Sequence, residues 1–183
     1  HHRGVFWMWP HITVDGATTA LVILRKAQVE PGQKVLIYGA SGSVGTFAVQ
    51  MARNLGARVT GVCSGKNLEL VRSLGAEKVI DYTVSDFTEN GETYDVIFDA
   101  VGKLSRSKVK RSLTKDGRYL NVLTDSGISM NLDIADLELV RDQIEARKLK
   151  TVIDRIYRLE DIVEAHRYVD TGHKRGNVAV IVT

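Results

Sequence analysis

Residues 34–45 have the sequence KVLIYGASGSVG, which joins a short apolar run to three glycines. The apolar run, 34–38, has the near-continuous hydrophobicity of a strand that is buried on both faces of a parallel sheet. Apolar residues then recur at helical spacing from Val44 to Leu55. A strand, a glycine turn and a helix in this order are what a dinucleotide-binding βαβ unit requires.

Each glycine of this stretch has a physical role in such a site. Gly39 lets the chain turn off the strand, Gly42 lets the backbone approach a pyrophosphate, and Gly45 lets the helix pack closely on the sheet. The free N–H groups at the helix start, near Ser43 and Val44, would face the phosphate oxygens. The alternative is a tight turn without a ligand, and the flanking strand and helix favour the dinucleotide site.

The rest of the chain continues this alternation of strands and helices. Further strands are predicted at 58–63, 78–80, 94–99, 117–122 and 178–182, and helices at 16–29, 44–55, 68–74, 104–113, 137–148 and 162–169. The pattern predicts an α/β fold with a doubly wound, mostly parallel sheet, which is a Rossmann-like dinucleotide-binding domain. We expect residues 1–183 to form one such domain, with residues 1–15 as an atypical N-terminal segment. The apolar cluster 6–9 in that segment is expected to pack on a neighbouring surface, with an aromatic ligand platform as the alternative.

Composition excludes several classes of protein. The 183 residues are 44% hydrophobic and 26% charged, as in an ordinary globular domain, and the apolar runs fall short of the roughly 20 residues that a membrane helix needs. The single cysteine, Cys63, excludes a disulfide framework and a cysteine-based zinc site, and favours a reducing, cytoplasmic location. His166 and His173 make a poor zinc site, so no metal is expected. A net charge of +3 gives no reason to expect a nucleic-acid partner.

The residues after the second strand predict which nicotinamide cofactor is bound. An NAD site places an acidic side chain about 20 residues after the glycines, to hold the ribose hydroxyls. This chain has Cys63-Ser64-Gly65-Lys66 there instead. Ser64 can donate a hydrogen bond to a 2′-phosphate and Lys66 supplies a positive charge, so the sequence favours NADP(H). The alternative is that Lys66 is simply solvated and NAD binds loosely.

Other nucleotide and catalytic motifs do not occur in the chain. No Gly-Lys-Ser/Thr follows the glycines, which disfavours a P-loop. The chain has no Tyr-x-x-x-Lys pair, which short-chain dehydrogenases use as a general acid. Nothing else in the sequence is placed to protonate a product, so we assign no catalytic residue.

Taken together, these motifs resemble the cofactor domain of the medium-chain dehydrogenase/reductase superfamily. The resemblance rests on residues 32–45 and on the later segments Leu74–Ala76, Val79–Tyr82, Asp95–Asp99, Gly117–Tyr119, Glu164–His166 and Gly172–His173. The branch that looks most similar is the zinc-free, NADPH-dependent quinone oxidoreductases and enone reductases.

The resemblance implies particular cofactor contacts. Ser41, Gly42, Ser43 and Val44 match the family's pyrophosphate loop, and Ser64 and Lys66 match its 2′-phosphate site, with Tyr82 beside it. Asp99 and Val101 belong to the stretch that lines the ribose and nicotinamide, and His173, Lys174 and Arg175 to a segment that touches the cofactor. Two alternatives stay open: Tyr82 as a half-buried aromatic at a strand end, and 173–175 as a solvated turn.

The family's reaction implies hydride transfer from NADPH to a small quinone or α,β-unsaturated carbonyl. The chain departs from the family before Gly16, where we expect the catalytic N-terminal domain to be absent, and between Val122 and Leu137, where the stretch is short. These departures leave two alternatives: a cofactor-binding module without independent activity, or the enoyl reductase domain of a larger synthase. The apolar last strand, 178–182, suggests a possible homodimer.

Overall fold

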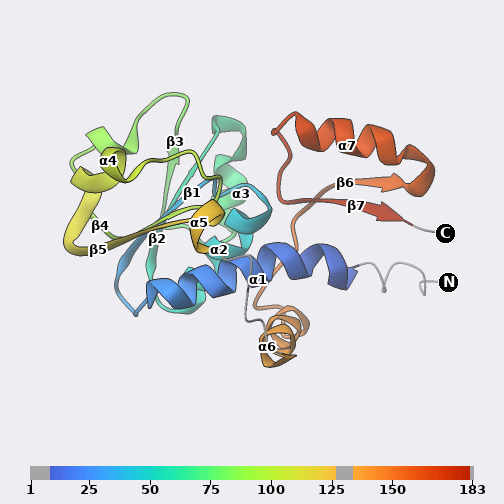
Figure 1. Ribbon diagram of the computed structural model, residues 1–183, viewed down its shortest axis with the longest axis horizontal. Coiled ribbons are helices and arrows are strands. Elements are labelled where there is room, and N and C mark those ends of the chain that lie inside the picture. Colours follow the sequence, from blue (N-terminus) through green and yellow to red (C-terminus); the bar gives the residue numbers. More distant parts are fainter. Residues whose placement is uncertain (1–8, 127–133, 182–183) are drawn as a thin grey trace.

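The computed structural model describes residues 9–126 and 134–181, and for residues 9–14 it describes the backbone alone (Figure 1). The main sheet has five parallel strands in the order β3-β2-β1-β4-β5. Its strands are β1 (Lys34–Tyr38), β2 (Arg58–Cys63), β3 (Lys78–Asp81), β4 (Tyr94–Asp99) and β5 (Leu113–Asn121). The chain winds from β1 outward to β3, and then crosses back to β4 and β5. The topological switch point, where ligands bind in such sheets, therefore lies between β1 and β4.

Helices cover both faces of this sheet. The helices of the described residues are α1 (Trp9–Ala27), α2 (Ser43–Asn54), α3 (Leu68–Ser73), α4 (Arg106–Val109), α5 (Val122–Asp125), α6 (Ile134–Glu145) and α7 (Ile162–Asp170), of which α7 packs away from the main sheet. Single 3₁₀ turns add η1 (Gly65–Asn67), η2 (Phe87–Glu89), η3 (Lys110–Ser112) and η4 (Leu159–Asp161). Helices α1, α2 and α3 pack on one face, and η2 and α4 on the other.

The side chains of β1 alternate between the two cores, as the period of a strand requires. Val35 and Ile37 join the core under α1 and α2, whereas Leu36 joins the core under α4 and Tyr38 packs at its edge. The three buried residues of this strand are fully inaccessible to solvent. β1 is therefore fixed on both faces, and the glycine loop at its carboxyl end starts from a rigid strand.

A second, two-stranded parallel sheet pairs β6 (Ile153–Arg158) with β7 (Asn177–Ile181), and α7 connects the two strands (Figure 1). It meets the main domain at the glycine loop. The Gly176 N–H donates to the Ser41 carbonyl at 2.7 Å, and Gly42 and Gly176 form an isolated parallel bridge. The last strand therefore lies against the loop between β1 and α2 and does not extend the main sheet.

The α/β class and the doubly wound parallel sheet predicted from the sequence are confirmed. Some predicted elements differ in detail. The first helix begins seven residues earlier than expected, at Trp9, because Pro10 is tolerated in a first helical turn. The helix expected over 104–113 is reduced to α4 and η3, and β5 begins at Leu113 with a register shift opposite Tyr94.

Strand β6 was not predicted, because its sequence IDRIYR mixes charges into an only partly buried strand. Residues 6–8 of the apolar cluster lie outside the described residues. The expectation that the whole chain forms one domain stays a prediction.

Candidate nucleotide-binding site

The turn between β1 and α2 has the geometry that the glycine spacing predicts. Gly39 has φ +79°, a conformation that favours glycine, and its N–H and that of Ala40 both donate to the Val62 carbonyl at 3.0 Å. The Gly39 carbonyl accepts from the Gly42 N–H at 3.1 Å. A Cβ on Gly45 would lie 2.1 Å from that carbonyl oxygen, so α2 touches the loop backbone there.

Gly42 differs from the other two glycines. Its φ of −81° and ψ of −179° are extended backbone that any residue can adopt. An added Cβ would meet a single atom within 4 Å, the Gly39 oxygen at 3.4 Å. The fold itself therefore has no need of glycine at this position. The open space beside Gly42 is where the backbone could approach a ligand.

The N-terminus of α2 lies at the open space beside Gly42. Gly42 is the N-cap residue and no side chain caps the helix, although the first N–H groups of a helix have no intrahelical acceptor. The Ser43 hydroxyl donates to the Asn177 side-chain oxygen on β7, which fixes the helix start against the small sheet. The uncapped N–H groups and the helix dipole make this end of α2 favourable for an anion.

The segment after β2 lies beside the same loop. Ser64 is half-buried, and Lys66 is exposed and takes part in none of the ion pairs found within the described ranges. The Asn67 amide nitrogen donates to the Ser41 hydroxyl oxygen at 3.1 Å and to the Ser64 hydroxyl oxygen at 3.2 Å. The glycine loop and the predicted 2′-phosphate segment are therefore joined through one buried side chain.

The end of β3 contributes a carboxylate and an aromatic ring to this edge of the sheet. The Asp81 carboxylate accepts from the Thr83 hydroxyl at 2.7 Å and the Thr83 N–H at 2.9 Å; these bonds, and a further one from the Gly65 N–H, hold the pKa of Asp81 below its usual value. Tyr82 is 53% exposed, and its ring centroid lies 6.4 Å from that of Tyr38. Tyr82 thus presents an aromatic surface at the strand end and is not packed into the core.

The end of β4 is organised around a buried carboxylate. Asp99 is fully inaccessible to solvent, and one of its oxygens accepts from the Val101 N–H at 3.0 Å and the Gly102 N–H at 2.8 Å. The other oxygen accepts from the Leu104 N–H at 2.6 Å. The Asp99 side chain therefore orders the loop, whereas Val101, 42% exposed, faces outward beside Gly39.

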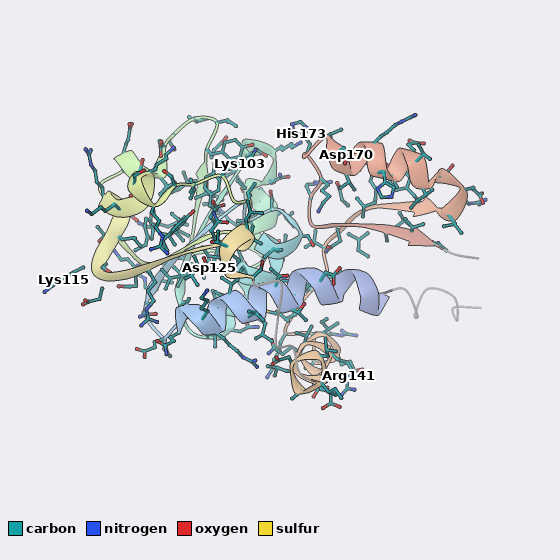
Figure 2. All side chains as sticks on the ribbon, in the orientation of Figure 1. Lys103, Lys115, Asp125, Arg141, Asp170 and His173 are labelled. Carbon is teal, nitrogen blue, oxygen red and sulfur yellow. The ribbon has the colours of Figure 1, made fainter. Side chains whose placement is uncertain are left out.

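The segment 173–175 precedes β7, and Figure 2 shows His173 on the side of the small sheet unit that faces the main sheet. His173 and Arg175 are exposed, and Arg175 pairs with Asp154 at 3.3 Å. The Lys174 ammonium donates to the Gly176 carbonyl at 2.7 Å, and burial lowers the pKa of this lysine. Because Gly176 bridges to Gly42, the segment lies next to the glycine loop.

The structure thus gathers the predicted residues at the carboxyl edge of the sheet. Asn67, Asp81 and Asn177 were not predicted as part of this site, because each acts through a contact between segments far apart in the sequence. Burial raises the pKa of the Cys63 thiol to about 11, which keeps it protonated at neutral pH. No cluster of metal-ligating side chains occurs within residues 9–126 and 134–181. Over the same ranges, none of the helices has the length and hydrophobicity to cross a membrane.

Comparison with known proteins agrees with this geometry. The family model described as zinc-binding dehydrogenase matches residues 74–180. A zinc-type alcohol dehydrogenase-like protein of Schizosaccharomyces pombe is 32% identical over 91% of this chain and 57% of its own length. The chloroplastic NADPH-dependent alkenal/one oxidoreductase of Arabidopsis thaliana is 30% identical over 92% of this chain and 45% of its own length.

The structure of the quinone oxidoreductase from Coxiella burnetii superimposes with a TM-score of 0.84 at 28% identity, over 92% of this chain and 59% of that one. The chain therefore belongs to the medium-chain dehydrogenase/reductase superfamily and is a nucleotide-binding domain of the zinc-binding dehydrogenase type. It spans about half the length of the curated relatives that it matches.

Proposed function

We propose that this chain binds NADP(H) and serves an oxidoreductase that transfers hydride from NADPH to a quinone or an α,β-unsaturated carbonyl. The observation that carries the proposal is the open, uncapped start of α2 beside Gly42, together with an exposed lysine at the end of β2. The named relatives include an NADPH-dependent alkenal/one oxidoreductase and a quinone oxidoreductase, which supports the cofactor and the substrate class.

In this proposal the glycine loop holds the diphosphate. Gly42 admits the phosphates to the loop backbone, and the N–H groups of Ser43, Val44 and Gly45 donate to their oxygens. The dipole of α2 adds its positive end to the same place. Ser41 presents a hydroxyl from the loop itself, and its carbonyl is already engaged by Gly176.

The 2′-phosphate and the adenosine lie over the ends of β2 and β3. Ser64 donates a hydrogen bond to the phosphate, and the Lys66 ammonium balances its charge. The exposed ring of Tyr82 offers a surface beside them. One Asp81 oxygen accepts from Thr83, and the carboxylate also accepts from the Gly65 N–H, in the segment between Ser64 and Lys66.

The ribose and nicotinamide extend along the ends of β1 and β4, where Val101, His173 and Arg175 are exposed and Lys174 is half-buried. The nicotinamide, when bound, supplies the hydride, and the chain's own residues bind and orient it. The described residues give no reason to assign a proton donor, and we assign none. The homodimer and the cytoplasmic location stay predictions; one of the named relatives is chloroplastic.

Replacing Lys66 by alanine is expected to weaken NADPH binding by about 10- to 100-fold, because a charge-assisted bond to one phosphate contributes about 1.5–3 kcal/mol. NADH lacks the 2′-phosphate, so its affinity should change by less than about threefold. Calorimetric titration of both cofactors measures the two changes. Lys115→Ala is the matched control, since Lys115 lies near the start of β5, at the opposite end of the sheet (Figure 2). Equal losses of NADPH and NADH would contradict the role of Lys66.

The second candidate is a cofactor-binding module without activity of its own, or an enoyl reductase domain of a larger synthase. Oxidation of NADPH by the purified chain with a quinone acceptor separates the two, and it is followed by the loss of absorbance of the reduced nicotinamide ring. Steady turnover supports the enzyme, and tight NADPH binding without turnover supports the module.

A further inference from the structure

The side chain of Asn67 points away from the helix that follows it and toward two serines. Asn67 is the N-cap residue of α3, where asparagine normally accepts a hydrogen bond from the helix backbone. Its side chain makes no capping bond here and is turned back toward Ser41 and Ser64. It contacts Ser64, three residues earlier in its own segment, and Ser41 in the glycine loop.

The direction of the two hydrogen bonds determines whether the serine hydroxyls can donate hydrogen bonds to a ligand. The Asn67 amide nitrogen is the donor in both, so each serine oxygen accepts and each hydroxyl proton remains free to be donated elsewhere. Had the amide oxygen been turned toward the serines, it would take up these protons itself. The observed orientation leaves both hydroxyls as donors, which is what an anion requires.

This orientation has a cost, which is visible in the structure. Asn67 is 3% exposed, and its side-chain oxygen is the one buried side-chain polar atom without a hydrogen-bond partner in the described part of the chain. A buried acceptor left unsatisfied is destabilising, and native proteins contain few of them. The amide thus supplies two donated bonds to the serines at the expense of its own oxygen.

We propose that Asn67 is a positioning residue for the dinucleotide: its amide holds Ser41 and Ser64 together as hydrogen-bond donors, one to the diphosphate and the other to the 2′-phosphate. The inference rests on the proposed NADP(H) function and deepens it. Asn67 itself, being buried, does not touch the cofactor. It couples recognition of the two phosphate groups, so that the selectivity for NADPH depends on a side chain beneath the site.

Leucine at position 67 tests this idea, because Asn67→Leu keeps the branched shape and removes both the donor and the unsatisfied oxygen. NADPH affinity should fall by about 10- to 100-fold, since two hydroxyl–phosphate bonds lose their orientation, and NADH affinity by roughly tenfold less, since it lacks one of them. The melting temperature should stay the same or rise, because a buried polar group without a partner has been removed.

Gln50→Leu is the matched control, and it should give the opposite pattern. Gln50 is a buried amide on α2 whose bonds are all structural: it donates to the Thr46 and Lys150 carbonyls and accepts from the Lys150 N–H. Its loss should lower the melting temperature and leave the ratio of NADPH to NADH affinity unchanged.

The outcomes separate the two proposals. If the unaltered chain fails to bind NADPH in calorimetry, the proposed function is wrong. If it binds NADPH and Asn67→Leu binds within about threefold of it, the positioning role is wrong and the function stands. A fall in melting temperature with equal losses for both cofactors would make Asn67 merely structural and would also overturn the inference.

Discussion

Gly42→Val is expected to abolish measurable binding of NADPH and NADH together while the chain stays folded. The extended backbone at Gly42 permits a side chain, and an added Cβ meets one oxygen at 3.4 Å. The valine methyl groups would instead fill the space in which the phosphates approach the loop. Losing two backbone bonds to a charged group, at about 1.5–3 kcal/mol each, weakens binding by roughly 100-fold or more.

The stability of this variant should change little. Valine is a poorer N-cap residue than glycine, which costs about 1 kcal/mol and lowers the melting temperature by roughly 2–4 °C for a chain of this size. Calorimetric titration with each nucleotide, together with thermal unfolding followed by circular dichroism, measures both effects. Native affinity for either nucleotide would show that the loop is only a turn.

Gly45→Ala, three residues along the same loop, is the contrasting control. Its Cβ would lie 2.1 Å from the Gly39 oxygen and 2.8 Å from the Ala40 Cα, both of which belong to backbone that is held by β2. Overpacking of this kind costs about 3 kcal/mol or more, so Gly45→Ala should lose stability first and binding as a consequence. The pair therefore distinguishes a glycine that the ligand needs from a glycine that the fold needs.

The contrast between Gly42 and Gly45 shows which features of the site could be predicted from the sequence. Three glycines at a spacing of three, after a continuous apolar run, are a local pattern, and local patterns predicted β1, the loop and α2 correctly. The sequence also assigned distinct roles to Gly42 and Gly45. The steric reason for each role needed coordinates, because it depends on atoms of neighbouring turns.

Residues whose roles depend on distant partners were not predicted. Asn67 lies 26 positions from Ser41 in the sequence, and Asn177 lies 134 positions from Ser43. Neither asparagine belongs to a short motif, and both are polar residues that could as well cap a helix or face solvent. Strand β6 was missed for a related reason: it is stabilised by pairing with β7 and only weakly by its own apolar pattern.

The cofactor contact predicted for Asp99 stays a prediction, and the structure shows that its side chain also orders a loop. A buried carboxylate that accepts from Val101, Gly102 and Leu104 fixes the loop on which Val101 is presented. The resemblance to the family located the segment, but a sequence could not show whether the carboxylate points toward a ligand or toward its own backbone. Substitution of this residue distinguishes the two possibilities.

Asp99→Asn is expected to destabilise the fold strongly, because one carboxylate oxygen must become an amide donor. The new amide NH2 group conflicts least where it replaces the oxygen that accepts from the Leu104 N–H at 2.6 Å. Two donors then face each other in a site without access to solvent. Losing a charge-assisted bond and leaving a buried N–H unpaired together cost about 2–4 kcal/mol. For a chain of this size, that lowers the melting temperature by roughly 4–16 °C.

Asp116→Asn, an exposed change on β5, is the matched control and should stay within about 0.5 kcal/mol of the native chain. Urea unfolding measures both variants. The decisive comparison is between stability and nucleotide affinity. If Asp99 acts by ordering its loop, affinity falls only with the loss of stability and recovers when the folded fraction is restored at low temperature. An Asp99→Asn chain with native stability and weakened NADPH binding would instead show that the carboxylate contacts the cofactor directly, with its loop held by other bonds.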